Sequence, residues 1–163
     1  MITDKDDVIR KSSPGTDIYS VILNAWADNV WRIPFTREGG YIATEIGDDG
    51  TDDTMRLSLS GFQDASGIWV HELTVVYFET LEKANKFRRS PVGQLFSDRF
   101  SDGQDNFDFH TYAGDPLIPA MMLSILQEFF GYKEYSPVVA HTYANIHYFR
   151  KDPEFTPPKP IGS

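Results

Sequence analysis

The sequence contains no cysteine, which excludes disulfide bonds, thiolate metal sites and cysteine nucleophiles together. It also lacks a Gly-x-Ser-x-Gly nucleophile elbow, a glycine-rich phosphate loop ending in Lys-Ser or Lys-Thr, and a dinucleotide-binding glycine fingerprint. The longest apolar stretch, Leu117–Phe130, is interrupted by polar residues and is too short to span a bilayer. No basic start followed by an apolar run marks a signal peptide, so we expect a cytoplasmic protein. The missing cofactor motifs lead us to expect no cofactor.

Positive charge is scarce, because 15 Lys and Arg oppose 24 Asp and Glu, for a net charge of −9. Nucleic-acid binding depends on cationic contacts to phosphate, so neither a nucleic acid nor a membrane is expected as a partner. The negative charge gathers in two windows, residues 47–53 and residues 98–108, which carry −4 and −3. Their acids are Asp48, Asp49, Asp52, Asp53, Asp98, Asp102, Asp105 and Asp108, and the single base between them is Arg99.

Aromatic residues are plentiful, at 14% of the chain, and hydrophobic residues make up 40%. A chain of 163 residues with this composition can bury a core without a metal or a disulfide, and its length fits one domain. Residues 1–15 are polar and end in Ser-Ser-Pro-Gly, so they are predicted to be a flexible arm. The domain is predicted to cover residues 16–151, and a proline-rich extended tail residues 152–163.

Apolar residues recur with helical spacing from Ile18 to Trp26, after a cap at Thr16 or Asp17, and Asn29 is expected to end this helix. Strand-like runs follow at residues 30–35, 40–47 and 55–62. The run at residues 68–78 is apolar on both faces and is therefore expected in the sheet interior.

The second half of the chain alternates between helix and strand signals. A helix is predicted from a Thr80 cap to Arg89, before Ser90-Pro91, and a second helical piece over residues 92–100. A buried helix runs from an Asp115 cap to Gly131, and a last strand covers residues 138–149. The predicted fold class is α+β, a single antiparallel β-meander sheet with helices packed on one face.

The acidic run at residues 48–53 has three interpretations: a hard-cation site, a solvated hairpin tip or an acidic docking loop. Calcium loops need about six or more oxygens and typically end in a bidentate Glu, and this run has neither that spacing nor that ending. His141 and His147 share one face of the predicted last strand, but six strand residues span about 20 Å, too far to share one zinc ion. No metal ligand is assigned, and that strand is expected to face solvent or a partner.

His71 and Glu72 are neighbours in the predicted interior strand, so their side chains point to opposite faces, and His71 is expected to be buried and hydrogen-bonded. Asp105, Asp108 and His110 lie in a predicted loop and could serve general acid–base chemistry. This set includes no nucleophile and no oxyanion motif, so no catalytic residue is assigned.

Two sequence segments resemble bacterial immunity proteins. They are Asn24-Ala25-Trp26-Ala27 at the end of the first helix and, after glycine-rich strands, Val75-Val76-Tyr77-Phe78-Glu79-Thr80-Leu81-Glu82-Lys83-Ala84. The resemblance covers residues 17–131, lies in the order of elements, and is in particular to the family that neutralises NAD-glycohydrolase toxins of the tuberculosis-necrotizing type. It implies a non-enzymatic cytosolic protein that occupies a toxin's NAD-binding cleft. It transfers no binding residue, because no position-specific motif is shared.

The leading hypothesis is therefore an immunity or inhibitor protein that binds and blocks a basic cognate toxin. Complementary charge accelerates encounter and selects partners, so the eight aspartates of the two windows are predicted to contact the partner. Arg10 and Lys11, on the predicted arm, are expected to reach an anionic pocket of the same partner. Two alternatives stay open: a small enzyme that uses Asp105, Asp108 and His110 or the His141 strand, and a general protein-interaction domain.

Overall fold

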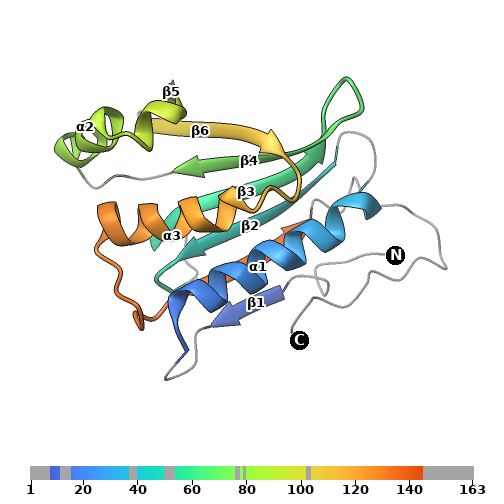
Figure 1. Ribbon diagram of the computed structural model, residues 1–163, viewed down its shortest axis with the longest axis horizontal. Coiled ribbons are helices and arrows are strands. Elements are labelled where there is room, and N and C mark those ends of the chain that lie inside the picture. The colour runs from blue at the N-terminus through green and yellow to red at the C-terminus, as the bar shows by residue number, and fades with distance from the viewer. Residues whose placement is uncertain are drawn as a thin grey trace.

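A computed structural model describes residues 8–11, 16–36, 40–49, 54–75, 78, 80–101 and 104–144. This part of the chain forms one antiparallel sheet with helices on one face, which confirms the predicted α+β class (Figure 1). The helices are α1 (Ile18–Arg32), α2 (Leu81–Arg89) and α3 (Leu117–Phe130), with short 3-10 turns η2 (Ile33–Phe35) and η4 (Gly93–Leu95). The strands are β1 (Val8–Lys11), β2 (Tyr41–Gly47), β3 (Met55–Gln63), β4 (Trp69–Val75), β5 (Ser97–Ser101), β6 (Gln104–Tyr112) and β7 (Val139–Ala144).

The sheet has the strand order β1-β7-β2-β3-β4-β6-β5. Strands β2, β3 and β4 form the predicted meander, and β4 lies in the interior as the two apolar faces of its sequence indicated. The flanks depart from a simple meander, because β6 pairs with β4 ahead of β5, and β7 returns to pair with β2. Strand β1 pairs with β7 inside the segment that the sequence predicted as an arm.

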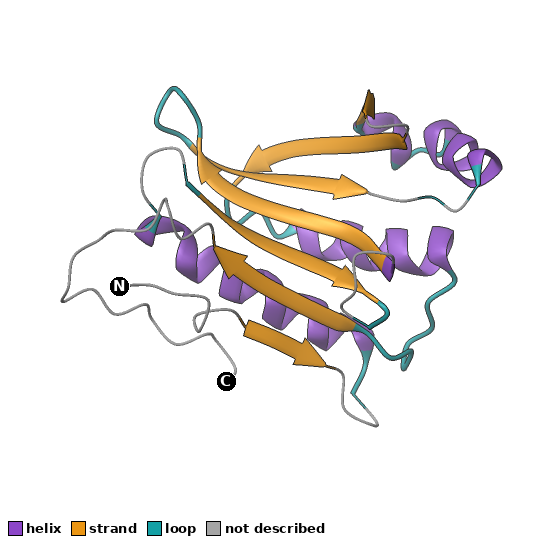
Figure 2. Cartoon of the chain, turned by 180° about the vertical axis from the view of Figure 1, so that it is seen from behind, coloured by secondary structure: helices purple, strands orange, loops and turns teal. Residues whose placement is uncertain are grey.

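Helices α1 and α3 cross the same face of the sheet, and α2 lies beside β5 and β6 at one end (Figures 1 and 2). The strands contribute alternate apolar residues to this side, such as Leu57 and Leu59 of β3 and Leu73 and Val75 of β4, all fully buried. Helices α1 and α3 contribute the buried residues Ile18, Ile22, Ile118, Met122 and Ile125 to the same core. The core therefore sits between one sheet face and the two long helices.

Phenylalanine rings fill the end of the core next to α2. Phe87 of α2 is fully buried, and its ring centroid lies 5.0–5.4 Å from the rings of four others: Phe78, Phe96, Phe107 and Phe129. Tilted and edge-to-face arrangements at such distances are favourable for aromatic pairs. This cluster anchors the short helix α2 to the sheet.

The predicted caps Asp17, Thr80 and Gly131 are confirmed, whereas α1 continues past the predicted end at Asn29 to Arg32, and Pro116 takes the N-cap position of α3 that was predicted for Asp115. The carboxylate of Asp17 accepts the backbone N–H of Ser20 at 3.2 Å, and the hydroxyl of Thr80 accepts that of Lys83 at 3.2 Å. Asp115 Oδ1 accepts the backbone N–H of Leu117 at 2.9 Å just before α3. Gly131 ends α3 with a φ of 73°, a left-handed conformation that glycine adopts without the cost imposed by a Cβ atom.

Three sequence predictions are wrong. Residues 30–35 form the last turn of α1 and η2 instead of a strand, because polar residues (Asp28, Asn29 and Arg32) continue the buried stripe of the helix. Residues 92–100 form η4 and the edge strand β5 instead of a helix, and the expected loop containing Asp105, Asp108 and His110 is strand β6. The last predicted strand is described only as far as Ala144, and residues 145–149 lie outside the described residues.

Candidate functional site

The two acidic windows lie at the same end of the sheet. Gly47 of β2 pairs with Met55 of β3 where that hairpin turns, and Ser101 of β5 pairs with Gln104 of β6 where the other turns. Strand β4 ends between them at Val75, which pairs with both Leu57 and Phe107. The fold thus brings together segments that are about fifty residues apart in the sequence.

The β2–β3 turn holds the larger excess of negative charge. Asp48 contacts Arg56 at 3.5 Å and accepts a hydrogen bond from the phenol of Tyr132. Burial of that phenol, together with the Asp48 carboxylate, raises the pKa of Tyr132. Asp49 Oδ1 accepts the hydroxyl of Thr54 at 2.6 Å, and both aspartates are exposed. Asp52 and Asp53 lie outside the described residues.

Arginines contact three of the four acids in the β5–β6 window. Arg88 of α2 contacts Asp98 at 2.5 Å and Asp105 at 3.4 Å, and hydrogen bonding to Asp98 raises the pKa of Arg88. Arg99 contacts Asp108 at 3.2 Å. With Arg88 and Arg99, the four acids of residues 98–108 sum to −2, whereas the four acids of residues 48–53 and Arg56 sum to −3. Asp102 lies outside the described residues, and the partner-binding role of both windows stays a prediction.

Arg10 and Lys11 belong to the edge strand β1, where their Cα atoms pair with those of Ala140 and Val139 of β7. The sequence placed them on an arm, and the structure places their backbone in the sheet. Their predicted contact with a partner is not tested by this placement.

The other sheet face carries no helix of the described residues, and we call it the helix-free face (Figure 2). Cross-strand pairing arranges its side chains in rows. One row is aromatic and apolar: Tyr41, Phe62, Val70 and Tyr112. The next row holds Tyr143, Ala43, Ser60, Glu72 and His110, and the third holds His141, Glu45, Ser58, Thr74 and Asp108. Ionisable and aromatic groups are therefore adjacent on this face.

A polar network crosses the helix-free face from β4 to β5. His110 Nε2 lies 2.6 Å from Glu72 Oε2, the Thr74 hydroxyl donates to Asp108 at 2.8 Å, and Asp108 reaches Arg99. Asp105 is an odd number of residues from Asp108 and His110 along β6, so its side chain points to the opposite sheet face, where it contacts Arg88. The three residues that the sequence grouped as an acid–base set are thus not assembled.

Ser60 and His110 do not form a nucleophile–base pair on this face either. Ser60 and His110 are separated by strand β4, since each pairs with Glu72. Two strand spacings amount to about 10 Å, well beyond the reach of a nucleophile–base hydrogen bond.

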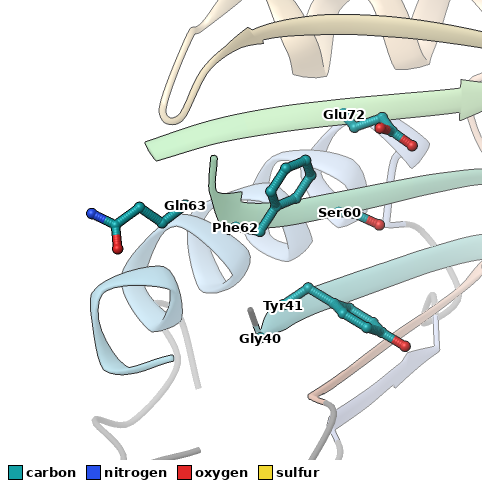
Figure 3. A pocket seen from close by; sticks show the side chains of 6 residues that line it. All are labelled: Gly40, Tyr41, Ser60, Phe62, Gln63 and Glu72. Carbon is teal, nitrogen blue, oxygen red and sulfur yellow. The ribbon is translucent and has the colours of Figure 1, made fainter. Parts of the chain in front are cut away.

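A pocket of about 300 Å³ opens between the first two rows (Figure 3). Its described lining is Gly40, Tyr41, Ser60, Phe62, Gln63 and Glu72. The side chains of Tyr41, Phe62 and Glu72 project from three neighbouring strands on the side away from α1, which lies behind the sheet in Figure 3. The pocket thus joins two aromatic rings to one carboxylate, a combination that the sequence did not reveal because these residues are up to 31 positions apart.

The predicted burial of His71 is confirmed, and its partners define a network under α1. His71 is fully buried, with Nε2 at 2.8 Å from Asn29 Oδ1 and Nδ1 at 3.4 Å from the backbone N of Gly114. Asn29 donates to Thr44 at 2.9 Å, and Thr44 bonds Thr142 at 2.9 Å. Desolvation lowers the pKa of His71 to about 4, partly offset by the charge of Asp115. This histidine is a neutral structural group.

No group of three or more His, Asp or Glu side chains suited to a metal ion occurs among the residues that the structure describes. His141 packs against Tyr143, with ring centroids 5.2 Å apart, and Tyr143 donates to Glu45 at 2.8 Å. His147 lies outside the described ranges. None of the described helices is both long and apolar enough to cross a membrane.

The geometry offers surfaces for recognition, namely an acidic turn and a small aromatic and acidic pocket, and no assembled catalytic set among the described residues. Comparison of the chain with protein-family models, with curated proteins and with solved structures found no match in any of the three.

Proposed function

We propose that this chain is a non-enzymatic cytoplasmic inhibitor that binds and blocks a basic partner protein, as immunity proteins do with their toxins. The observation that carries the proposal is the −3 excess at the β2–β3 turn, at the sheet end that also holds the second acidic window. Concentrated negative potential steers a basic partner and speeds its association.

The acidic turn is suited to first encounter with a partner. Asp48 and Asp49 are exposed, so they keep most of their hydration while attracting distant positive charge. In the β5–β6 window, Asp98 and Asp105 contact Arg88 and Asp108 contacts Arg99, so these three acids add less to the field. We therefore assign the main steering role to residues 48–53.

The test compares two triple variants of the full chain with equal net charge. Asp49→Asn/Asp52→Asn/Asp53→Asn neutralises the turn and leaves the Asp48 contacts in place. Glu82→Gln/Glu128→Gln/Glu134→Gln removes three exposed acids elsewhere. A partner is first captured from the lysate of cells that carry this chain's gene and identified by mass spectrometry. Association rates are then measured at low salt.

We expect the turn variant to associate about tenfold more slowly than the matched control, because steering contributes most to the on-rate at low salt. The captured protein should also arrest growth when expressed without this chain, and co-expression should restore growth. Equal on-rates for the two variants, or a partner that stays active in the complex, would contradict the proposal.

A further inference from the structure

The pocket on the helix-free face has walls of two kinds. Tyr41 of β2 and Phe62 of β3 are direct cross-strand partners and supply aromatic surface. Glu72 of β4 supplies a carboxylate beside them, and Ser60 supplies a hydroxyl (Figure 3). The described lining contains no basic side chain. A positively charged group therefore meets attraction from both the ring faces and the carboxylate.

The carboxylate is held in place and retains contact with solvent. The side chain of Glu72 is 26% exposed, and His110 Nε2 lies 2.6 Å from one of its carboxylate oxygens. A neutral imidazole that donates its Nε2–H leaves the carboxylate its negative charge. Glu72 is thus an oriented anion at the edge of an aromatic wall.

The size of the pocket and the shape of the cation limit the class of ligand further. Pockets for drug-sized molecules range from about 300 to 1,000 Å³, so a hollow of about 300 Å³ fits a side chain better than a nucleotide or a peptide segment. Guanidinium is planar, weakly hydrated and stacks on aromatic rings while it bonds carboxylates, whereas ammonium is a strongly hydrated point charge.

We propose that this pocket binds an arginine side chain of the partner protein, with the guanidinium against Tyr41 and Phe62 and bonded to Glu72. This inference rests on the proposed function, since it gives the basic partner a defined anchor. The acidic turn then governs the rate of encounter, and the pocket governs how long the complex lasts. Buried aromatic and arginine contacts are the interactions that most often dominate interface energy.

The experiment titrates the isotope-labelled full chain with a blocked Gly-Arg-Gly peptide and follows backbone amide shifts by NMR. The matched peptide replaces arginine by citrulline, which keeps the shape and removes the charge. We expect shifts centred on residues 40, 41, 60, 62, 63 and 72, with a dissociation constant on the order of 1–10 mM. The citrulline peptide should produce no shifts at these positions.

Variants assign the affinity to individual side chains. Glu72→Gln should weaken arginine binding at least fivefold, because the amide oxygen still accepts a hydrogen bond but no longer carries the negative charge that strengthens it. Phe62→Leu keeps the apolar wall without the ring face and should weaken binding about threefold. Glu45→Gln is the control, because Glu45 lies on the same face but outside the pocket lining and bonds Tyr143. If Glu72→Gln does not fold, Phe62→Leu carries the test.

The two proposals can fail separately. Equal shifts with citrulline, or equal effects of Glu72→Gln and Glu45→Gln, overturn the pocket assignment even if a basic partner is captured. Conversely, if arginine binds the pocket as described but the capture experiment yields no basic partner, the pocket stands and the inhibitor function falls.

Discussion

Burial of His71 beneath α1 makes the stability of the fold sensitive to the protonation of this side chain. The histidine is fully buried, and desolvation lowers its pKa to about 4 from the value of 6.5 for a solvated imidazole. A pKa difference of one corresponds to about 1.36 kcal/mol, so full protonation of His71 destabilises the fold by about 3 kcal/mol. A domain of this size is stable by roughly 5–15 kcal/mol, so the effect is a large fraction of the total.

The sign follows from the direction of the pKa change. Because the folded-state pKa is lowered, the unfolded chain binds the proton more tightly. The stabilisation is therefore fully present above pH 6.5 and is lost as the pH falls toward 4. Linkage gives a loss of about 2 kcal/mol between pH 7 and pH 5. The carboxylates of Asp17, Asp64 and Asp115 have pKa values lowered below 3.8 by hydrogen bonds, so their protonation destabilises the fold only at lower pH.

The perturbation is His71→Gln, whose amide can donate to Asn29 and accept from Gly114 without titrating. Urea unfolding is followed by tryptophan fluorescence at pH 5, 6, 7 and 8, and the m-values are compared to confirm a two-state transition. We expect the variant to lose most of the 2 kcal/mol change between pH 7 and pH 5. The control His110→Gln, whose side chain is 56% exposed, should retain it. An unchanged pH dependence in His71→Gln would refute the reasoning.

Two further substitutions test the packing on the helix-covered face. Gly61→Ala places a Cβ atom 2.5 Å from Ile33 and 2.8 Å from Asn29 Oδ1, so it should lower the free energy of unfolding in urea by about 1–3 kcal/mol. The control Ser58→Ala, on the other face of β3, should lower it by under about 0.5 kcal/mol. Equal losses of stability in the two variants would contradict the close approach of α1. Phe87→Ala removes the centre of the aromatic cluster and should cost about 3–5 kcal/mol. Phe100→Ala, 71% exposed, should cost under about 0.5 kcal/mol, and a comparable loss there would show that Phe87 is not the anchor of α2.

Local chemistry made part of the fold readable from the sequence. Thr80 marks the start of α2 and Gly131 marks the end of α3, because an N-cap and a left-handed glycine act within a few residues of the chain. Strand β3 was evident because Leu57 and Leu59 alternate with serines. Such signals depend on neighbours in the chain, so one sequence suffices to detect them.

The errors have a different origin. The end of α1 resembled a strand because its buried positions, Asp28, Asn29 and Arg32, are polar and break the apolar periodicity. Strand β5 resembled a helix continuation because an edge strand with two exposed charges lacks apolar alternation. Strand β6 carried a period-2 signal, in which Phe107 and Phe109 alternate with polar residues, that identifies it in retrospect.

The pocket was not predictable at all from one sequence. Tyr41, Phe62 and Glu72 meet because the register of two hairpins aligns them, and register is set by packing across the sheet. The acidic turn, in contrast, was visible because its charges are consecutive. The structure adds that Arg88, which lies outside the second window in the sequence, contacts two of its acids.

Polar groups are buried on the helix-covered face of the sheet and partly exposed on the helix-free face, and this difference assigns the first set to stability and the second to recognition. Under α1, His71 Nε2 must donate, because the amide oxygen of Asn29 only accepts, and Nδ1 must accept, because the N–H of Gly114 only donates. One neutral tautomer satisfies both contacts, so a change at His71 should alter stability and leave binding intact. Across the sheet, Glu72 and His110 keep 26% and 56% of their side chains exposed. Substitution of the pocket residue Glu72 should therefore alter binding, and substitution of the largely exposed His110 should have little effect on stability.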